Sequence, residues 1–219
     1  MSDIHNSRME AVFAPAQGTI DHLWSSLVRK GEFDDTKRIL FTSCFHDEGT
    51  TTVASCAAIG LARHLFKQVM LVETNFFQPA LAEYMGLPHE PGFSDLIRGE
   101  ATLEEAFRPS GVPGLRLVPA GSGEAKGFLG SSRLQVILHR LANECEHLVI
   151  DAPPLLTSPE ARLLLPFVDE VILVTRARRT THQDIQRAVR IIDASGTTFL
   201  GAVLNHYRRE APTWLVPEG

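Results

Sequence analysis

The chain has 219 residues, of which 44% are apolar and 21% are charged, a composition typical of a soluble globular protein. Its formal net charge of −5 argues against a general nucleic-acid binder and against direct binding to anionic membranes. The three cysteines contain no CxxC pair and are odd in number, so we expect free buried thiols in a reducing compartment. No signal peptide and no run of about 18 apolar residues is visible, which predicts a cytoplasmic protein.

Two segments precede the regularly patterned part of the chain. Residues 1–15 are polar and contain Pro15, so we expect a flexible N-terminus. Residues 16–36 are predicted to form a helix and a linker, because apolar residues recur with helical spacing from Ile20 to Val28. This apolar stripe either packs on the chain's own sheet or docks on a neighbouring subunit.

From residue 37 to residue 207, short aliphatic runs alternate with longer stretches of helical periodicity. The runs are 38–42, 69–72, 115–118, 147–150, 171–174 and 199–204. Several are apolar throughout, as expected of strands that helices cover on both faces. The alternation predicts one doubly wound α/β domain with a mostly parallel sheet and helices on both faces. Residues 208–219 follow as a C-terminal tail without periodicity.

A candidate phosphate-binding loop follows the first predicted strand. Residues 44–52 read Cys-Phe-His-Asp-Glu-Gly-Thr-Thr-Thr and open a helix rich in alanine. The backbone N–H groups and the dipole of a helix N-terminus favour bound phosphate, so Gly49, Thr50, Thr51 and Thr52 are candidate binding residues. A full P-loop, GxxxxGK[ST], has a lysine where this chain has Thr50. A simple helix cap is the alternative interpretation.

Polar side chains at the ends of later strands strengthen the case for a ligand site. Glu73 and Asp151 end two buried runs, and Asn205 ends the last one. Ligands of open α/β sheets bind at the carboxyl ends of the strands, so these residues should converge with Gly49 on one crevice. An acidic residue in the position of Asp151 holds the magnesium shell in P-loop proteins. The alternative for Asp151 is a cap of the following helix.

Together these segments resemble the cytoplasmic P-loop domain of bacterial tyrosine kinases of capsule and exopolysaccharide synthesis, relatives of the MinD and ParA ATPases. The resemblance covers roughly residues 16–207. Three family motifs are matched by 47–52, 73–79 and 149–154, and further family segments by 91–99, 117–121 and 203–205. The resemblance implies ATP and Mg²⁺ as cofactors. It places Gly49, Thr50, Thr51, Thr52 and Asn205 at the nucleotide.

The same resemblance implies the remaining site residues and a partner. Thr51 and Asp151 would hold the magnesium ion, and Glu73, Asn75 and Asp151 stand at the catalytic positions. The implied partner is a membrane protein of the polysaccharide chain-length-determinant type, which would hold the chain at the inner face of the membrane. A homo-oligomer is left open, and no nucleic acid is expected.

The chain departs from the family pattern at several of these positions. Thr50 replaces the lysine, Glu73 and Asn75 replace two aspartates, and Phe77 replaces an arginine. The C-terminal tyrosine cluster of autophosphorylating members is missing, since only Tyr84 and Tyr207 are present. The family's Glu-x-x-Arg-x-x-Arg oligomerisation motif would fall on Gly18, Asp21 and Trp24, and none of these residues matches it.

Three functions are therefore compatible with the sequence. The departures favour a protein with impaired ATP binding that acts through protein contacts in polysaccharide assembly or export. The first alternative is an active tyrosine kinase or ATPase of the same pathway, in which Lys37, Arg38 or a partner's arginine replaces the missing lysine. The second is a positioning ATPase of the MinD/ParA type. The arginines at 176, 178, 179, 208 and 209 form either a solvated rim or a patch that faces a phosphate or a partner.

Overall fold

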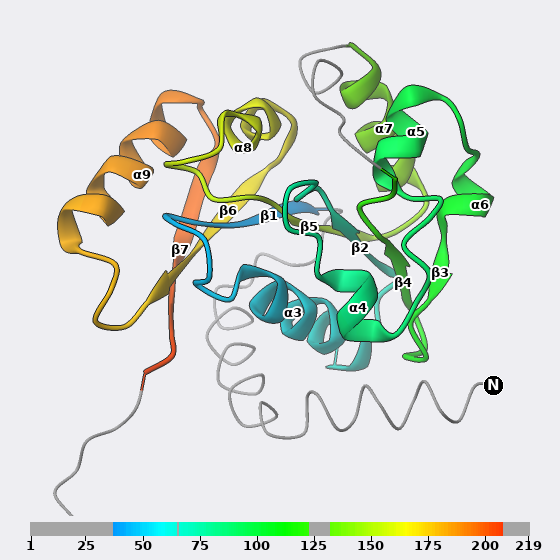
Figure 1. The fold of residues 1–219 in the computed structure, drawn as a ribbon, viewed down its shortest axis with the longest axis horizontal. Coiled ribbons are helices and arrows are strands. Elements are labelled where there is room, and N and C mark those ends of the chain that lie inside the picture. The colour runs from blue at the N-terminus through cyan, green and yellow to red at the C-terminus, as the bar shows by residue number, and fades with distance from the viewer. Residues whose placement is uncertain (1–36, 65, 123–131, 208–219) are drawn as a thin grey trace, which may run out of the picture.

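The computed structural model describes residues 37–64, 66–122 and 132–207 (Figure 1). The predicted flexible N-terminus (1–15), the predicted N-terminal helix and linker (16–36) and the tail (208–219) lie outside the described residues. So do Arg208 and Arg209 and the expected oligomerisation positions Gly18, Asp21 and Trp24. In the described part, no helix is both long enough and apolar enough to cross a membrane.

Seven strands form one sheet in the order β3-β4-β2-β5-β1-β6-β7 (Figure 1). Their bounds are β1 Lys37–Ser43, β2 Val69–Glu73, β3 Arg108–Pro109, β4 Leu115–Val118, β5 His147–Asp151, β6 Glu170–Arg176 and β7 Thr198–Asn205. Each neighbouring pair is parallel except the pair of β3 and β4. The predicted doubly wound, mostly parallel α/β fold is confirmed, and all six predicted strands are present.

Helices cover both faces of the sheet. On one face lie α3 (Thr50–His64) and α4 (Leu81–Met85) (Figure 1). On the other face lie α5 (Phe93–Arg98), α6 (Leu103–Ala106), α7 (Ser132–Asn143), α8 (Pro159–Leu164), the short 3₁₀ turn η2 (Leu165–Phe167) and α9 (His182–Ala194).

Alternation along the strands divides the core into two layers. In β1, Ile39 and Phe41 pack toward α3, whereas Leu40 packs in the cluster formed with α5 and α7. Successive side chains of a strand point to opposite faces of the sheet. A strand that is buried on both faces is therefore apolar at nearly every position. This explains why the central runs showed no polar alternation in the sequence.

Strand β3 was not predicted. It has two residues, Arg108 and Pro109, and pairs antiparallel with β4 at the edge of the sheet. Proline has no N–H to donate and is tolerated in sheets at such edges. A run this short, containing proline, carries no strand periodicity that a sequence could display.

Candidate functional site

The candidate phosphate loop connects β1 to α3, and α3 begins at Thr50. Gly49 has a φ of +87°, and a Cβ atom there would lie 2.1 Å from Nδ2 of Asn205. The positive φ favours glycine, and a Cβ atom there would displace the Asn205 amide from its contact with the loop. The same Nδ2 donates a hydrogen bond of 2.9 Å to the carbonyl oxygen of Glu48. Asn205, predicted from the end of a distant strand, thus contacts the loop directly.

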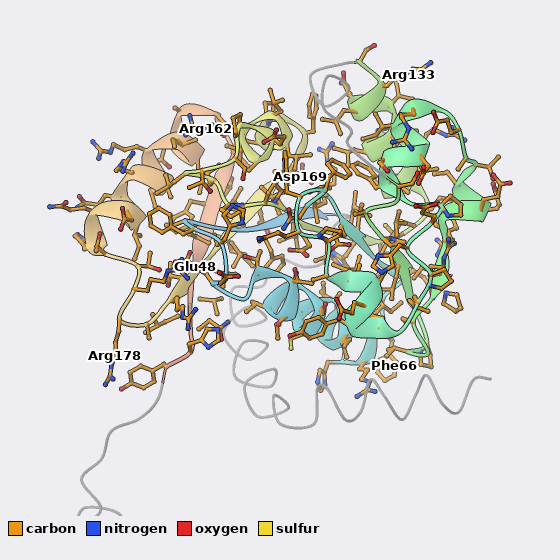
Figure 2. All side chains as sticks on the ribbon, viewed as in Figure 1. Glu48, Phe66, Arg133, Arg162, Asp169 and Arg178 are labelled. Atoms are coloured by element: carbon orange, nitrogen blue, oxygen red, sulfur yellow. The ribbon has the colours of Figure 1, made fainter. Side chains whose placement is uncertain are left out.

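The buried carboxylate of Glu48 accepts hydrogen bonds that hold the loop in place. Glu48 is 1% exposed, and its Oε2 accepts hydrogen bonds from the N–H groups of Cys44 (2.8 Å) and Phe45 (3.1 Å). Its Oε1 accepts the hydroxyl of Thr180, which lies in the connection between β6 and α9. Figure 2 shows Glu48 beside the start of α3. Sequence reasoning assigned Glu48 no role, although a loop with unpaired N–H groups needs such an acceptor.

Asp151 lies where the sequence predicted it, next to the loop. It is buried at the end of β5, and the Thr51 hydroxyl is close enough to form a side-chain hydrogen bond with it. Burial raises the pKa of Asp151 well above its ordinary value, the nearby Glu73 carboxylate raises it further, and the Thr51 hydroxyl partly opposes both effects. Its Oδ2 atom has no hydrogen-bond partner among the described residues. Asp151 does not cap α8, whose N-cap residue is Ser158.

Glu73 is the register partner of Asp151 on the adjacent strand β2, but its carboxylate is already occupied. Oε1 accepts the N–H groups of Ala80 (2.5 Å) and Leu81 (2.9 Å), and Oε2 accepts that of Ala120 (3.2 Å). Burial raises the pKa of Glu73, and these three hydrogen bonds work in the opposite direction. The pKa of both carboxyl groups is thus raised by burial, and Glu73 has three backbone N–H donors that oppose the shift whereas Asp151 has the Thr51 hydroxyl.

Two further positions of this motif, Asn75 and Phe77, carry uncharged side chains. The Asn75 side-chain oxygen accepts the N–H of Gln78 at 3.3 Å, which closes a local turn. Phe77, where the resembled family has an arginine, is 46% exposed. Neither side chain supplies a charge. Beside them, the hydroxyl of Thr52 donates to that of Tyr84 at 3.3 Å, which links α3 to α4.

Arg38, one of the candidates to replace the missing lysine in the active-enzyme alternative, does not reach the phosphate loop. Arg38 lies near the start of β1, where its guanidinium pairs with Asp169 at 2.7 Å, whereas the phosphate loop follows the end of that strand. Lys37 begins the same strand and is one residue farther from the loop. Among the described residues, no cluster of three or more histidine, cysteine, aspartate or glutamate side chains could hold a metal.

A pocket of about 390 Å³ adjoins the loop at the ends of β6 and β7. It is lined by Arg176, Ala177, Arg178, Thr180, Leu204, His206 and Tyr207. The ring of His206 lies near Gly49, where a Cβ atom would be 3.7 Å from its Nε2. A volume of this size suits a nucleoside.

The residues present fit part of a magnesium nucleotide. The unpaired oxygen of Asp151 and the adjacent Thr51 hydroxyl are oxygen ligands of the kind that Mg²⁺ takes, and the pocket beside Asn205 could receive a base and ribose. The phosphate position has the start of a helix but no lysine, since Thr50 is neutral. The chain's own residues could thus orient a nucleotide, whereas the supply of positive charge is the weak point.

Comparison with known proteins identifies the homologues of the chain. The sequence matches no protein-family model. Tyrosine-protein kinase ptk of Acinetobacter johnsonii is 23% identical over 66% of this chain, which spans only 20% of that kinase. Tyrosine-protein kinase CpsD of Streptococcus agalactiae is 24% identical over 82% of this chain and 80% of CpsD. The homologues are thus bacterial tyrosine kinases, as the resemblance implied.

Solved structures agree with this relationship. The VpsO kinase domain is 26% identical, with a TM-score of 0.76 over 94% of this chain and 98% of that domain. The kinase domain of the Escherichia coli tyrosine kinase ETK is 21% identical, with a TM-score of 0.83 over 93% of this chain and 82% of the other. The septum site-determining protein MinD of Pyrococcus horikoshii, complexed with Mg-ADP, is 21% identical, with a TM-score of 0.67 over 78% of this chain and 70% of MinD. The last two likenesses show the fold.

Proposed function

We propose that this protein acts in capsule or exopolysaccharide assembly as a relative of the bacterial tyrosine kinases that binds ATP and Mg²⁺ weakly and does not transfer phosphate. In this role it works through contacts with a membrane protein of the chain-length-determinant type. That partner would hold it at the inner face of the cell membrane. The partner and the pathway follow from the resemblance to capsule and exopolysaccharide kinases.

The observation that carries this proposal is the state of Glu73. Both of its oxygens accept backbone N–H groups, from Ala80, Leu81 and Ala120, so the carboxylate supports the segments around it. Catalysis of phosphoryl transfer consists largely of positioning and charge stabilisation. With Glu73 engaged in this way, Asn75 neutral and Thr50 uncharged, two of the three catalytic positions offer no free carboxylate and the loop has no lysine.

Two observations support residual nucleotide binding. The Thr51 hydroxyl and the unpaired Oδ2 of Asp151 lie together at the start of α3. The hydrogen bonds of Glu48 and Asn205 hold the loop conformation, which lowers the cost of ordering the loop on binding. A dissociation constant between roughly 10 μM and 1 mM for ATP with Mg²⁺ is expected, equivalent to about −7 to −4 kcal/mol.

An active tyrosine kinase or ATPase is the second candidate, which the adjacency of Thr51 and Asp151 favours. A MinD- or ParA-like positioning ATPase is a third, and the shared fold alone supports it. The three differ in what happens to ATP. The proposed function predicts binding without hydrolysis, and both alternatives predict turnover.

The decisive experiment measures binding and turnover on the same preparation. ATP binding is followed by calorimetry with Mg²⁺, and ADP release and phosphotyrosine are followed over hours, with Asp151→Asn as the matched negative control. We expect heat of binding in the parent chain and ADP release no faster than in the control. ADP release that Asp151→Asn abolishes would contradict the proposal and support an active enzyme.

The partner is tested separately. The cytoplasmic segment of a chain-length-determinant protein from the same organism is immobilised, and capture of the full chain is measured with and without ATP and Mg²⁺. We expect capture under both conditions, and equal capture of Asp151→Asn, because contacts rather than phosphate transfer are proposed to carry the function. Capture that requires both ATP and Asp151 would instead indicate a nucleotide-driven cycle.

A further inference from the structure

The connection between β6 and α9 lies against the phosphate loop and brings an arginine to it. Arg176 is the last residue of β6 and the register partner of Asn205. Its Nη1 donates a hydrogen bond of 3.1 Å to the carbonyl oxygen of Asp47, inside the loop. Its backbone N–H donates to the Thr180 hydroxyl at 2.9 Å, and that hydroxyl in turn donates to Glu48. Arg176 is therefore tied to the loop by its main chain and its side chain.

The charges around the loop give this contact its importance. Glu48, Glu73 and Asp151 are all buried acidic residues near the loop, and Thr50 brings no compensating charge. Within residues 37–64, 66–122 and 132–207, Arg176 forms no ion pair with a carboxylate, so its charge is not neutralised by a salt bridge there. Its guanidinium has five N–H donors in a planar fork that matches phosphate oxygens.

We propose that Arg176 supplies the positive charge that Thr50, unlike the lysine of a full P-loop, does not bring, so that a nucleotide polyphosphate is attracted from the β6 side of the loop. This inference rests on the proposed weak binding of a nucleotide and names the residue responsible for it. The charge need not stand where a lysine at position 50 would stand, because Coulomb attraction extends beyond contact distance. Arg176 also lines the 390 Å³ pocket, so one side chain borders both halves of the nucleotide site.

Other arginines are less well placed for this role. Arg38 is paired with Asp169 near the opposite end of the strands. Arg178 also lines the pocket, but it lies in the β6–α9 connection and points away from Glu48 (Figure 2). Arg179 is exposed three residues after Arg176 and does not line the pocket, which makes it a matched control for the loss of one positive charge.

The test compares Arg176→Gln and Arg179→Gln in the full chain by calorimetry, with ATP plus Mg²⁺ and with adenosine as the two probes. We expect Arg176→Gln to weaken ATP binding at least tenfold, about 1.4 kcal/mol, and Arg179→Gln to weaken it less than about twofold. Adenosine carries no phosphate charge, so its affinity should change far less than that of ATP in Arg176→Gln and should stay unchanged in Arg179→Gln. Equal loss of ATP affinity in both variants would show that Arg176 acts only as part of the general surface charge. Equal loss of adenosine and ATP affinity in Arg176→Gln would show that Arg176 contacts the base. Either outcome would overturn the inference.

Two further variants separate charge from loop structure. Arg176→Lys should retain at least a third of the parent's ATP affinity, and Thr50→Lys should restore binding to Arg176→Gln, because each returns a positive charge to the loop. Failure of both rescues, with unfolding temperatures unchanged, would overturn the inference. If the parent chain binds no ATP at millimolar concentration, Arg176 does not replace the lysine. The lack of phosphate transfer is judged independently by ADP release.

Discussion

Two buried carboxylates on adjacent strands repel each other if both are ionised. Their surroundings must therefore differ. Asp151 and Glu73 occupy paired positions on β5 and β2, and both are buried. Three N–H groups from outside the strands stabilise ionised Glu73, whereas Asp151 has the hydroxyl of Thr51 and an unpaired oxygen. The pair therefore divides into a structural member, Glu73, whose oxygens are both hydrogen-bonded to the backbone, and a second member, Asp151, whose Oδ2 is open to a cation.

The first prediction concerns the pH dependence of stability. The pKa of Asp151 is raised in the native state, so above the unfolded value of about 3.9 the unfolded chain has released a proton that the native chain still holds. Stability from this group is thus complete at low pH and is lost as pH rises toward the native pKa. We expect Asp151→Asn to remove this loss, so that its unfolding temperature exceeds the parent's at neutral pH and the difference shrinks toward about pH 4. Thermal unfolding in chelator measures it.

The effect of Mg²⁺ on thermal stability tests whether Asp151 binds the cation. Added Mg²⁺ should raise the unfolding temperature of the parent chain and leave Asp151→Asn unchanged, because a ligand that binds the native state stabilises it. A variant whose pH profile runs parallel to the parent's would show that Asp151 is ionised in the folded protein.

The second prediction is that the neighbouring substitution acts in the opposite direction. Glu73→Gln keeps one oxygen acceptor but turns an amide N–H₂ toward one of the backbone N–H groups that Glu73 now accepts. A buried donor left unpaired costs about 1–3 kcal/mol. We expect Glu73→Gln to lower the free energy of unfolding by that amount at neutral pH, measured by urea titration. A neutral or stabilising effect would mean that the carboxylate is not the acceptor described.

The third prediction concerns the three free thiols, Cys44, Cys56 and Cys145. Burial raises the pKa of each to about 12, and the nearby Glu48 carboxylate adds to the effect at Cys44. At pH 8 only about one thiol in 10⁴ would be ionised, and the thiolate is the reactive form. We expect iodoacetamide to label the native chain at least 100-fold more slowly than the urea-unfolded chain, as read by mass spectrometry. Rapid native labelling of Cys44 would show that the loop opens.

At the scale of elements, two segments recognised from sequence prove to be partners in space. The N–H groups of Phe93 and Ser94 donate to the carbonyl oxygens of Pro119 and Ala120, each at 2.8 Å. Asp95 then accepts the N–H groups of Gly92 and Ser122. The start of α5 is thereby attached to the end of β4, next to the Ala120 N–H that binds Glu73. The two segments that resemble the family, 91–99 and 117–121, thus pack against each other next to the site.

The fourth prediction tests this attachment. A Cβ atom on Gly92 would lie 2.4 Å from both Gly121 N and Pro119 O, which are backbone atoms that cannot move aside, whereas Gly196 has nothing within 4 Å. We expect Gly92→Ala to destabilise the fold by about 3 kcal/mol or more. Gly196→Ala, whose φ is +78°, should cost only about 1 kcal/mol of backbone strain. Equal effects in urea unfolding would indicate that the α5–β4 contact yields easily.

Across the whole molecule, sequence reasoning succeeded where the pattern was local. The six long strands and the position of Asp151 beside Thr51 followed from apolar runs and from the geometry of parallel sheets. What it missed depends on contacts between distant segments. The hydrogen bond from the Ala120 N–H to Glu73 joins residues 47 positions apart, and that from Arg176 to the loop joins residues 129 positions apart. No spacing or composition encodes such contacts.

The last prediction asks whether the site can be repaired. Thr50→Lys should strengthen ATP binding, because it adds a second positive charge at the loop. It should not start phosphate transfer while Glu73 remains engaged and Asn75 neutral. Asn75→Asp alone should add no turnover, since it brings a negative charge without the lysine. The effects of substitutions in one site are not additive. We therefore expect turnover only in the double variant, at a rate above the sum of the rates of the two single variants. ADP release over hours, with Asp151→Asn added as the background, measures it. Full turnover from Thr50→Lys alone would show that the occupied Glu73 is no obstacle, and that the loop charge was the one catalytic element missing.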